Sequence, residues 1–299
     1  MSCSSPLLAV DNGFKADGIT RDIKLIPRRV DYSYEYLRSR YGDKLMMLPC
    51  GSCDACIFAR RKMWALRCYA ESLYHTVNCL VTLTYDDDHL PSDGKLQKRD
   101  FQAFIKSIRN SGFKVRYYGV GEYGGLTGRP HYHLILFGFF PDDAKFHSMT
   151  KSGFYQFTSR FLSDLWGKGF CTVSNFTPEV AGYVAGYVDK KYKQRDCFSL
   201  MSKKPGLGEQ YFYDHFDKFY ECDSIVMKNG SIGKVPRYFD KLAELIGVDI
   251  SDVKAERLDM ANYQMFKEMR SRGFVAIEQL NKFNEGMFKD KLNRKKRGL

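Results

Sequence analysis

The sequence lacks an uninterrupted apolar run of the roughly 18 residues that a membrane-spanning helix needs. It also contains no internal repeat and no low-complexity tract. Its 44% hydrophobic content, with 23 Phe and 20 Tyr, indicates a globular protein and excludes a disordered or fibrous one. Residues 1–10 have neither the basic region nor the long apolar region of a signal peptide, so we expect a cytoplasmic protein. Acidic residues are in deficit, 35 against 47 Lys and Arg, which leaves a net charge of +12. This surplus favours nucleic acid as the partner, with an anionic membrane surface as the alternative.

An even set of cysteines is also lacking. The count is nine, which argues against a closed disulfide framework, and in a cytosol these thiols stay reduced. Cys50, Cys53 and Cys56 have two residues between neighbours and Cys68 follows twelve residues later, which offers four thiolates for a structural zinc. An iron–sulfur cluster and metal-free thiols are the alternatives. The other cysteines show no ligand spacing: Cys3, Cys79, Cys171, Cys197 and Cys222.

A basic run follows this cluster. If zinc binds, the resulting knuckle would present these side chains to DNA: Arg60, Arg61 and Lys62.

Hydrophobic periodicity and turn residues predict alternating strands and helices. Strands are expected at 79–85, 114–122, 131–139 and 170–176, and helices at 57–76, 97–110, 154–166 and 177–192. The Gly-rich loop 123–130 predicts a hairpin between the second and third strands. Residues 1–45 show no sustained period. The last third is aromatic and mostly helical, with one hairpin signal at Asn229-Gly230 and a basic tail at 289–297.

The third of these strands carries His131 and His133. Residues two apart on a strand share a face, so both imidazoles can serve one metal ion. Glu122 ends the preceding strand, where it can lie opposite His131 as a third ligand. This set would suit Mn²⁺, Mg²⁺ or Zn²⁺ and leave positions open for a phosphate oxygen. The alternative is two histidines at a sheet surface without a metal.

The helix expected at 177–192 carries two tyrosines four residues apart. Tyr183, Tyr187 and Lys190 fall on one stripe of this helix, and Val180 and its i+4 repeats form the adjoining stripe that faces the sheet. Two glycines in the helix, Gly182 and Gly186, suggest a close approach by another backbone or a ligand. The alternative is a helix that packs two aromatic rings and exposes two lysines at its end.

Taken in order, three segments resemble an HUH endonuclease, specifically the rolling-circle replication initiators of small icosahedral single-stranded DNA phages of the microvirus and gokushovirus group. The segments are LVTLTYDDDHLP (80–91), YYGVGEYG to GRPHYHLILFG (117–138) and AGYVAGYVDKK (181–191). The cysteine cluster and KVPRYFDKL (234–242) resemble further segments of the family.

The resemblance implies that His131 and His133, with Glu122, bind a divalent cation. It implies that Tyr187, with Lys190, is a nucleophile and Tyr183 a second one. The implied reaction is transesterification at a replication origin, which leaves a 5′-phosphotyrosine and a free 3′-OH primer and can be reversed to rejoin the strand. The substrate would be single-stranded DNA, contacted by basic residues such as Lys191. Host helicase and polymerase are expected partners, and the host cytoplasm is the expected location.

We therefore expect an α+β fold. A central antiparallel sheet of about five strands carries the HUH metal site and has helices packed on it, beside a Cys-rich knuckle and a mostly helical C-terminal region. The expected divisions are an irregular segment 1–45, an endonuclease domain 46–200 and a C-terminal region 201–299. Two other hypotheses remain open: a non-catalytic, zinc-dependent nucleic-acid-binding protein, and a zinc hydrolase built on the two histidines and Glu122.

Overall fold

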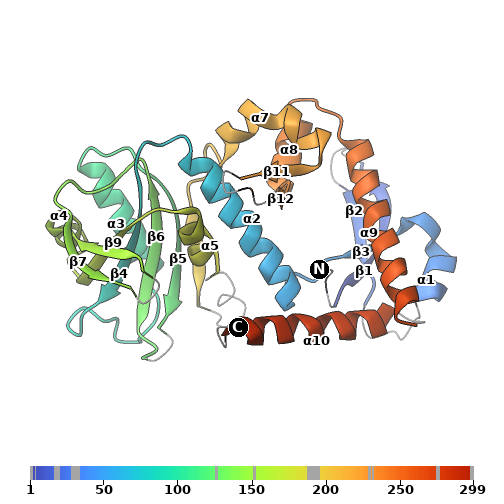
Figure 1. Ribbon diagram of the computed structural model, residues 1–299, viewed down its shortest axis with the longest axis horizontal. Coiled ribbons are helices and arrows are strands. Elements are labelled where there is room, and N and C mark those ends of the chain that lie inside the picture. The colour runs from blue at the N-terminus through green and yellow to red at the C-terminus, as the bar shows by residue number, and fades with distance from the viewer. Residues whose placement is uncertain are drawn as a thin grey trace. The chain divides into compact units, whose positions relative to one another are not determined.

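The structure is a computed structural model of the whole chain (Figure 1). It describes residues 3, 5–16, 21–27, 34–124, 127–150, 153–186, 196–227, 230, 232–273 and 277–296. None of the helices in these ranges is both long and apolar enough to cross a membrane.

The secondary structure alternates short strands with helices. The elements are β1 (Leu7–Phe14), β2 (Arg21–Leu25), α1 (Tyr34–Tyr41), η1 (Gly42–Lys44), β3 (Leu45–Leu48), α2 (Asp54–Ser72), β4 (Asn78–Tyr85), α3 (Lys98–Asn110), β5 (Arg116–Tyr123), β6 (Pro130–Phe137), β7 (Lys145–Met149), β8 (Tyr155–Thr158), α4 (Arg160–Trp166), β9 (Gly169–Asn175), α5 (Pro178–Gly186), β10 (Phe198–Met201), α7 (Glu209–Glu221), β11 (Ser224–Val226), β12 (Ile232–Lys234), α8 (Arg237–Leu245), α9 (Ser251–Ser271) and α10 (Ile277–Lys296).

The chain divides into two compact units. One comprises Met1–Ala59 and Lys254–Leu299, and the other comprises Arg60–Val253. This division differs from the expected boundaries after residues 45 and 200. Residues 201–253 group with the large sheet, and the last two helices group with the N-terminal strands.

The larger unit is built on a seven-stranded sheet in the order β10-β5-β6-β4-β9-β8-β7. Every neighbouring pair is antiparallel, as expected. The sheet has seven strands where about five were expected, because β7, β8 and β10 join the four strands that were predicted by residue range. β4 is the central strand, and β6 lies between β5 and β4.

Helices cover both faces of this sheet (Figure 1). On one face, α3 and α4 bury alternate residues of β4 and β6, such as Leu83 and Leu134. On the other face, α5 packs on Leu80 and Ile135. Trp64 of α2 stacks on Tyr118 of β5, with 5.0 Å between the two ring centres. β6, the strand with the His-Tyr-His motif, is therefore covered on both faces.

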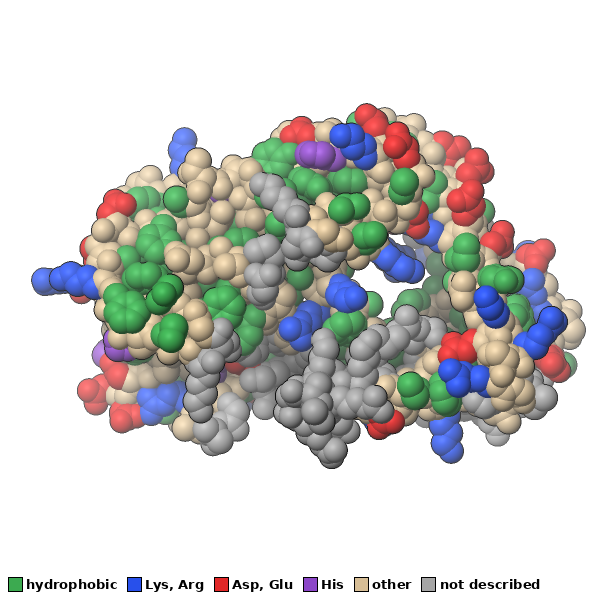
Figure 2. Space-filling model, in the orientation of Figure 1, with side chains coloured by type: hydrophobic (Ala, Val, Ile, Leu, Met, Phe, Trp, Pro, Cys, Tyr) green, Lys and Arg blue, Asp and Glu red, His purple; other side chains and the backbone are tan. Residues whose placement is uncertain are grey.

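The helix expected at 154–166 is wrong in its first part. Tyr155–Thr158 forms strand β8, which pairs with β7 and β9. The helix begins only after Ser159, whose hydroxyl accepts a hydrogen bond from the Leu162 amide at 3.1 Å as an N-cap. Hydrophobic side chains gather at the surface over this edge of the sheet (Figure 2). β7 exposes Phe146 and Met149, and β8 exposes Tyr155.

The expectation that residues 1–45 are irregular is also wrong. They contain β1 and β2, which form a three-stranded antiparallel sheet with β3 in the order β2-β1-β3, and the helix α1. β2 exposes four of its five side chains, so it lacks the hydrophobic alternation by which a strand is recognised.

The chain from 201 to 253 contains a separate aromatic core. Phe212, Phe219 and Phe239 of α7 and α8 are buried there with Leu66 and Ala70 of α2. The hairpin predicted near Gly230 is present as the antiparallel pair β11 and β12.

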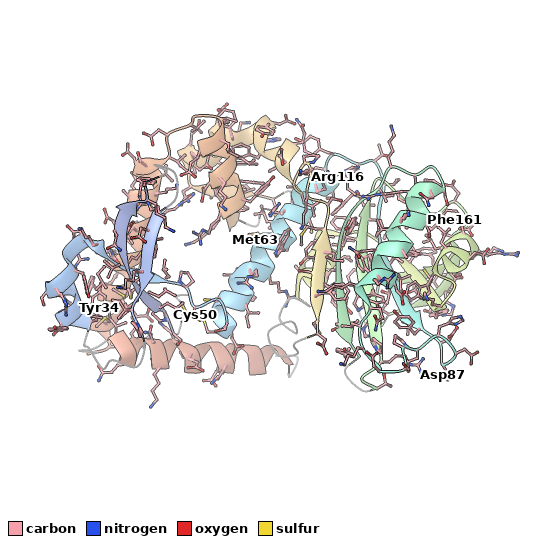
Figure 3. The ribbon with its side chains drawn as sticks, turned by 180° about the vertical axis from the view of Figure 1, so that it is seen from behind. Tyr34, Cys50, Met63, Asp87, Arg116 and Phe161 are labelled. Atoms are coloured by element: carbon pink, nitrogen blue, oxygen red, sulfur yellow. The ribbon has the colours of Figure 1, made fainter. Side chains whose placement is uncertain are left out.

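One buried carboxylate joins three parts of the larger unit. Glu71, near the end of α2, accepts hydrogen bonds from Arg116 at the start of β5, from His75 and from the Gly208 amide before α7. Arg116 lies beside the C-terminal end of α2 (Figure 3). Burial opposes ionisation of Glu71, but the hydrogen bonds from His75 and Gly208 and the charge of Arg116 outweigh it and hold its pKa below the usual value.

Glu71→Gln should lower the free energy of unfolding at pH 7 by about 2 kcal/mol, since hydrogen bonds to a charged group are worth roughly 1.5–3 kcal/mol. The pKa of Glu71 is lower in the folded than in the unfolded chain, so its stabilisation is complete above the unfolded pKa of about 4.3 and is lost as pH falls through the folded pKa. The difference in the free energy of unfolding between wild type and Glu71→Gln should therefore become smaller below about pH 4.

Urea titrations followed by tryptophan fluorescence test this, because the only two tryptophans, Trp64 and Trp166, both lie in the larger unit. The exposed Glu221→Gln is the control. Equal urea unfolding curves for Glu71→Gln and Glu221→Gln at pH 7 would contradict the stabilising role of Glu71.

Candidate metal and tyrosine site

The register of β5 on β6 brings Glu122 directly opposite His131. The Gly124 amide donates to the carbonyl oxygen of Arg129 at 2.9 Å and closes the hairpin next to this pair. His133 lies two residues further along β6 and faces Thr82 of β4 on its other side. Since directly opposed residues share a face, all four side chains lie on the face that α5 also covers. The pairing inferred from the hairpin pattern is therefore observed.

The three candidate ligands converge on one carboxylate oxygen. His131 Nε2 is 2.9 Å and His133 Nε2 is 3.3 Å from Glu122 Oε1, and one ligand atom from each residue lies within 4.8 Å of the other two. Glu122 is 2% exposed and His133 5%. A carboxylate this deeply buried needs compensating positive charge, and a divalent cation held with the two imidazoles would supply it.

A second layer of contacts fixes both imidazole rings. His131 Nδ1 lies 3.1 Å from the Arg129 carbonyl oxygen, which can only accept, so Nδ1 can donate to this oxygen while Nε2 offers its lone pair to a bound cation. His133 Nδ1 lies 3.1 Å from the Thr82 hydroxyl. The Nε2 atoms of both rings point toward Glu122, while the Nδ1 atom of each ring is held by a hydrogen bond. This arrangement is usual for histidines that bind a metal ion. The donor set of two nitrogens and one carboxylate fits a divalent cation and leaves coordination positions open.

The loop before His131 is anchored by Arg129. Its guanidinium donates to the Tyr85 carbonyl oxygen at 2.7 Å and pairs with the Asp87 carboxylate. Asp87 lies in the turn after β4, at the end of the sheet that also carries this loop (Figure 3). The contact sets the position of the carbonyl that orients His131.

Helix α5 carries the first of the two tyrosines. The Thr177 hydroxyl accepts a hydrogen bond from the Val180 amide at 3.3 Å and so caps the start of the helix. Val180 and Val184 are buried against the sheet, which confirms that their stripe faces it. Tyr183 is 51% exposed, and its ring centre lies 6.0 Å from that of His133 in an edge-on arrangement. Tyr183 thus lies beside the three candidate ligands.

Three other residues expected to take part in the chemistry or in DNA contact lie outside the described part of the chain: Tyr187, Lys190 and Lys191. Their roles stay predictions.

The two glycines of α5 differ in their surroundings. A Cβ at Gly186 would lie 2.9 Å from the guanidinium carbon of Arg61, whereas one at Gly182 would meet nothing within 4 Å. Arg61 Nε also donates to the Gly182 carbonyl oxygen at 2.8 Å. The close approach expected from the sequence is therefore made at Gly186, by a side chain of α2. Arg61, predicted to contact DNA, contacts the tyrosine helix. Of its neighbours in the basic run, Lys62 is exposed and Arg60 is half-buried, and DNA contact by them stays a prediction.

The cysteine cluster differs from the expected set in one member. Cys50, Cys53 and Cys56 gather with Cys3, whereas Cys68 is completely buried in the hydrophobic core of the larger unit. Cys68 lies twelve residues beyond Cys56 on α2, about 18 Å along a helix that rises 1.5 Å per residue, so it cannot join the other three. The sequence offered no spacing signal for Cys3.

Thr82 was not recognised from the sequence either. It lies in the first family-like segment, but its contact with His133 depends on the pairing of β4 with β6.

Comparison with known proteins finds a family match over the segment that contains this site. A family model for replication-associated proteins of the ORF2 type matches residues 78–192, which include the three candidate ligands and α5. No solved structure shows a significant match.

Three phage proteins are similar over longer stretches. Replication-associated protein VP4 of Bdellovibrio phage phiMH2K is 37% identical over 207 residues, which are 64% of this chain and 65% of that protein. Replication-associated protein ORF2 of Spiroplasma virus 4 is 31% identical over 244 residues, 74% of this chain and 76% of that protein. Replication-associated protein ORF4 of Chlamydia phage 1 is 33% identical over 221 residues, 68% and 55% of the two chains. The chain therefore belongs to the family of replication-associated proteins of microvirus- and gokushovirus-type phages.

Proposed function

We propose that this protein initiates rolling-circle replication by nicking one DNA strand at the origin and later rejoining the displaced strand. The observation that carries the proposal is the convergence of Glu122, His131 and His133 beside an exposed tyrosine, Tyr183. That this chain belongs to a family of phage replication-associated proteins supports the same reading.

Two other hypotheses explain less. A zinc hydrolase would use the three ligands but would not need tyrosines on the adjacent helix. A non-catalytic, zinc-dependent nucleic-acid-binding protein would leave unexplained a buried carboxylate shared by two oriented imidazoles. Transesterification uses both features.

In the proposed site, Glu122, His131 and His133 hold a divalent cation, with Mg²⁺ or Mn²⁺ as the candidates. When bound, the cation supplies Lewis-acid activation of the scissile phosphate. Thr82 and the Arg129 carbonyl keep the two imidazoles oriented toward it.

The nucleophiles are tyrosine phenols. One phenol oxygen attacks phosphorus, the bond from phosphorus to the 3′ oxygen breaks, the phenol gives up its proton, and the 3′ oxygen takes one up. The product is a 5′-phosphotyrosine and a 3′-OH primer. The reverse attack by a 3′-OH restores the phosphodiester, because the covalent link retains its energy.

Family resemblance assigns one nucleophile to Tyr187 assisted by Lys190, and the other to Tyr183. A spacing of four residues, about one helical turn, would let both phenols approach the same phosphate in successive rounds. The substrate must be single-stranded or extruded near the cut. The net charge of +12 suits this ligand. Host helicase and polymerase are proposed partners, and the host cytoplasm the proposed location.

Removal of one candidate metal ligand should weaken metal binding strongly. His133→Ala should weaken Mn²⁺ binding in calorimetry by more than about 100-fold, since loss of an outer hydrogen-bond partner alone costs roughly 10–100-fold. Thr82→Val removes only the hydrogen-bond partner of His133, so its Mn²⁺ affinity should lie between those of the wild type and of His133→Ala. His147→Ala, an exposed histidine on β7, is the matched control. If His133→Ala bound Mn²⁺ as the control does, the metal site would be wrong.

Covalent adduct formation tests the tyrosines. Single-stranded oligonucleotides that tile the genome encoding this chain, incubated with protein and Mn²⁺, should yield a 5′-linked adduct that survives denaturing gel electrophoresis. The double variant Tyr183→Phe/Tyr187→Phe should form none, whereas Tyr213→Phe, a half-exposed tyrosine on α7, should form it at the wild-type rate. A normal adduct rate in the double variant would refute tyrosine transesterification.

The two glycines of α5 provide a matched pair of variants. Gly182→Ala should raise the free energy of unfolding by about 1 kcal/mol and leave the adduct rate unchanged, because its Cβ meets open space. Gly186→Ala should push Arg61 off the Gly182 carbonyl and lower the adduct rate by about tenfold, the effect of a 1.4 kcal/mol loss of positioning. Identical rates in the two variants would show that Arg61 does not position the tyrosine helix.

A further inference from the structure

The smaller unit contains a second group of metal-ligating side chains. The sulfur atoms of Cys3, Cys50, Cys53 and Cys56 all lie within 4.8 Å of one another. The sulfur atoms of Cys3 and Cys53 are 3.7 Å apart, and those of Cys50 and Cys56 are 4.0 Å apart. In a tetrahedral zinc site with Zn–S bonds of about 2.3 Å, neighbouring sulfurs are about 3.8 Å apart. A disulfide would require about 2.05 Å. The spacing is that of four thiolates around one ion.

Strand pairing explains how Cys3 reaches residues almost fifty positions away. β1 and β3 are antiparallel, with Leu7 opposite Leu48. The chain before Leu7 and the chain after Leu48 therefore leave the sheet at the same end, where Cys3 and Cys50 lie. The Cys50 amide is 3.3 Å from the Cys3 sulfur. The register of a small sheet, and not a local motif, selects the fourth cysteine.

The start of α2 supplies the other two thiols. Cys53 immediately precedes the helix, and its carbonyl oxygen accepts the first helical hydrogen bond, from Ile57, at 3.0 Å. Cys56 lies in the first turn, and Cys50 lies where the chain approaches the helix (Figure 3). A helix N-terminus favours negative charge and hence thiolate.

Hydrogen-bond donors also point at the sulfur of Cys50. The Cys53 amide is 3.3 Å from it and the Ser52 hydroxyl 3.6 Å. Such donors stabilise and orient a ligating thiolate. All four cysteines are half-buried, so a bound ion would be largely shielded from water while the chain could still open to admit it.

We propose that Cys3, Cys50, Cys53 and Cys56 bind one structural Zn²⁺ that fastens the N-terminal sheet to the start of α2. Few side chains are buried in the described part of the smaller unit, among them Ala9, Val10, Leu37, Leu45 and Ile57. A core this small gains much of its stability from a closed metal site. The site is separate from Glu122, His131 and His133 and takes no part in the chemistry proposed for them.

Cobalt substitution tests the ligand set directly. The full chain is purified, its metal removed under reducing conditions, and Co²⁺ added to the His131→Ala/His133→Ala background, so that only the cysteine site responds. Tetrahedral thiolate ligation should give sulfur-to-cobalt charge-transfer absorption and d–d bands at one equivalent per chain. Elemental analysis of protein as purified should show one zinc.

Three single variants separate the candidate ligands. Cys3→Ser should lose the four-thiolate spectrum, whereas Cys68→Ala and the exposed Cys222→Ser should keep it. Tryptophan fluorescence confirms that the larger unit remains folded in each variant, because both tryptophans belong to it.

Loss of the spectrum in Cys68→Ala with retention in Cys3→Ser would overturn the assignment. So would broad iron–sulfur absorption with iron and acid-labile sulfide in the purified protein, or an absence of both metals with no cobalt uptake. Zinc should also protect β1 and β3 from amide hydrogen exchange. Equal exchange with and without zinc would contradict the structural role.

Discussion

The register between β5, β6 and β4 is the constraint on which the candidate site depends. It sets Glu122 opposite His131 and Thr82 opposite His133, so that one carboxylate, two imidazoles and a hydroxyl share a face. A slip of one residue in β6 would turn both histidines to the opposite face, and the same slip in β5 or β4 would turn away Glu122 or Thr82. The hydrophobic residues that follow on β6 hold the register, because both faces of that strand are buried.

The same face receives the tyrosine helix. Val180 and Val184 fit against the sheet next to His133, and Ala181 and Ala185 are completely buried. Small and β-branched side chains let α5 lie close to the strand, which leaves Tyr183 exposed beside His133. Arg61 reaches from α2 to the same helix. The candidate metal ligands and the proposed nucleophile Tyr183 are thus carried by separate elements whose positions are fixed by packing.

Local patterns predicted most of this site, and contacts between distant segments account for what was missed. The hairpin and the His-Tyr-His spacing place Glu122, His131 and His133 within about a dozen residues, so alternation alone relates them. Cys3 and Thr82 each meet their partners through strand pairings across about fifty residues, which no local spacing encodes. The first half of 154–166 has aromatic residues at helical intervals, but pairing with β7 and β9 makes it a strand, and the Ser159 cap delays the helix.

The central claim is that Glu122, His131 and His133 hold one catalytic cation beside the tyrosines. Anomalous diffraction from crystals of the full chain soaked in Mn²⁺ tests it most directly, since manganese is then located without reference to activity. The account predicts one strong anomalous peak within coordination distance of Glu122 and of Nε2 of both histidines. A peak elsewhere, with none beside these three side chains, would contradict it.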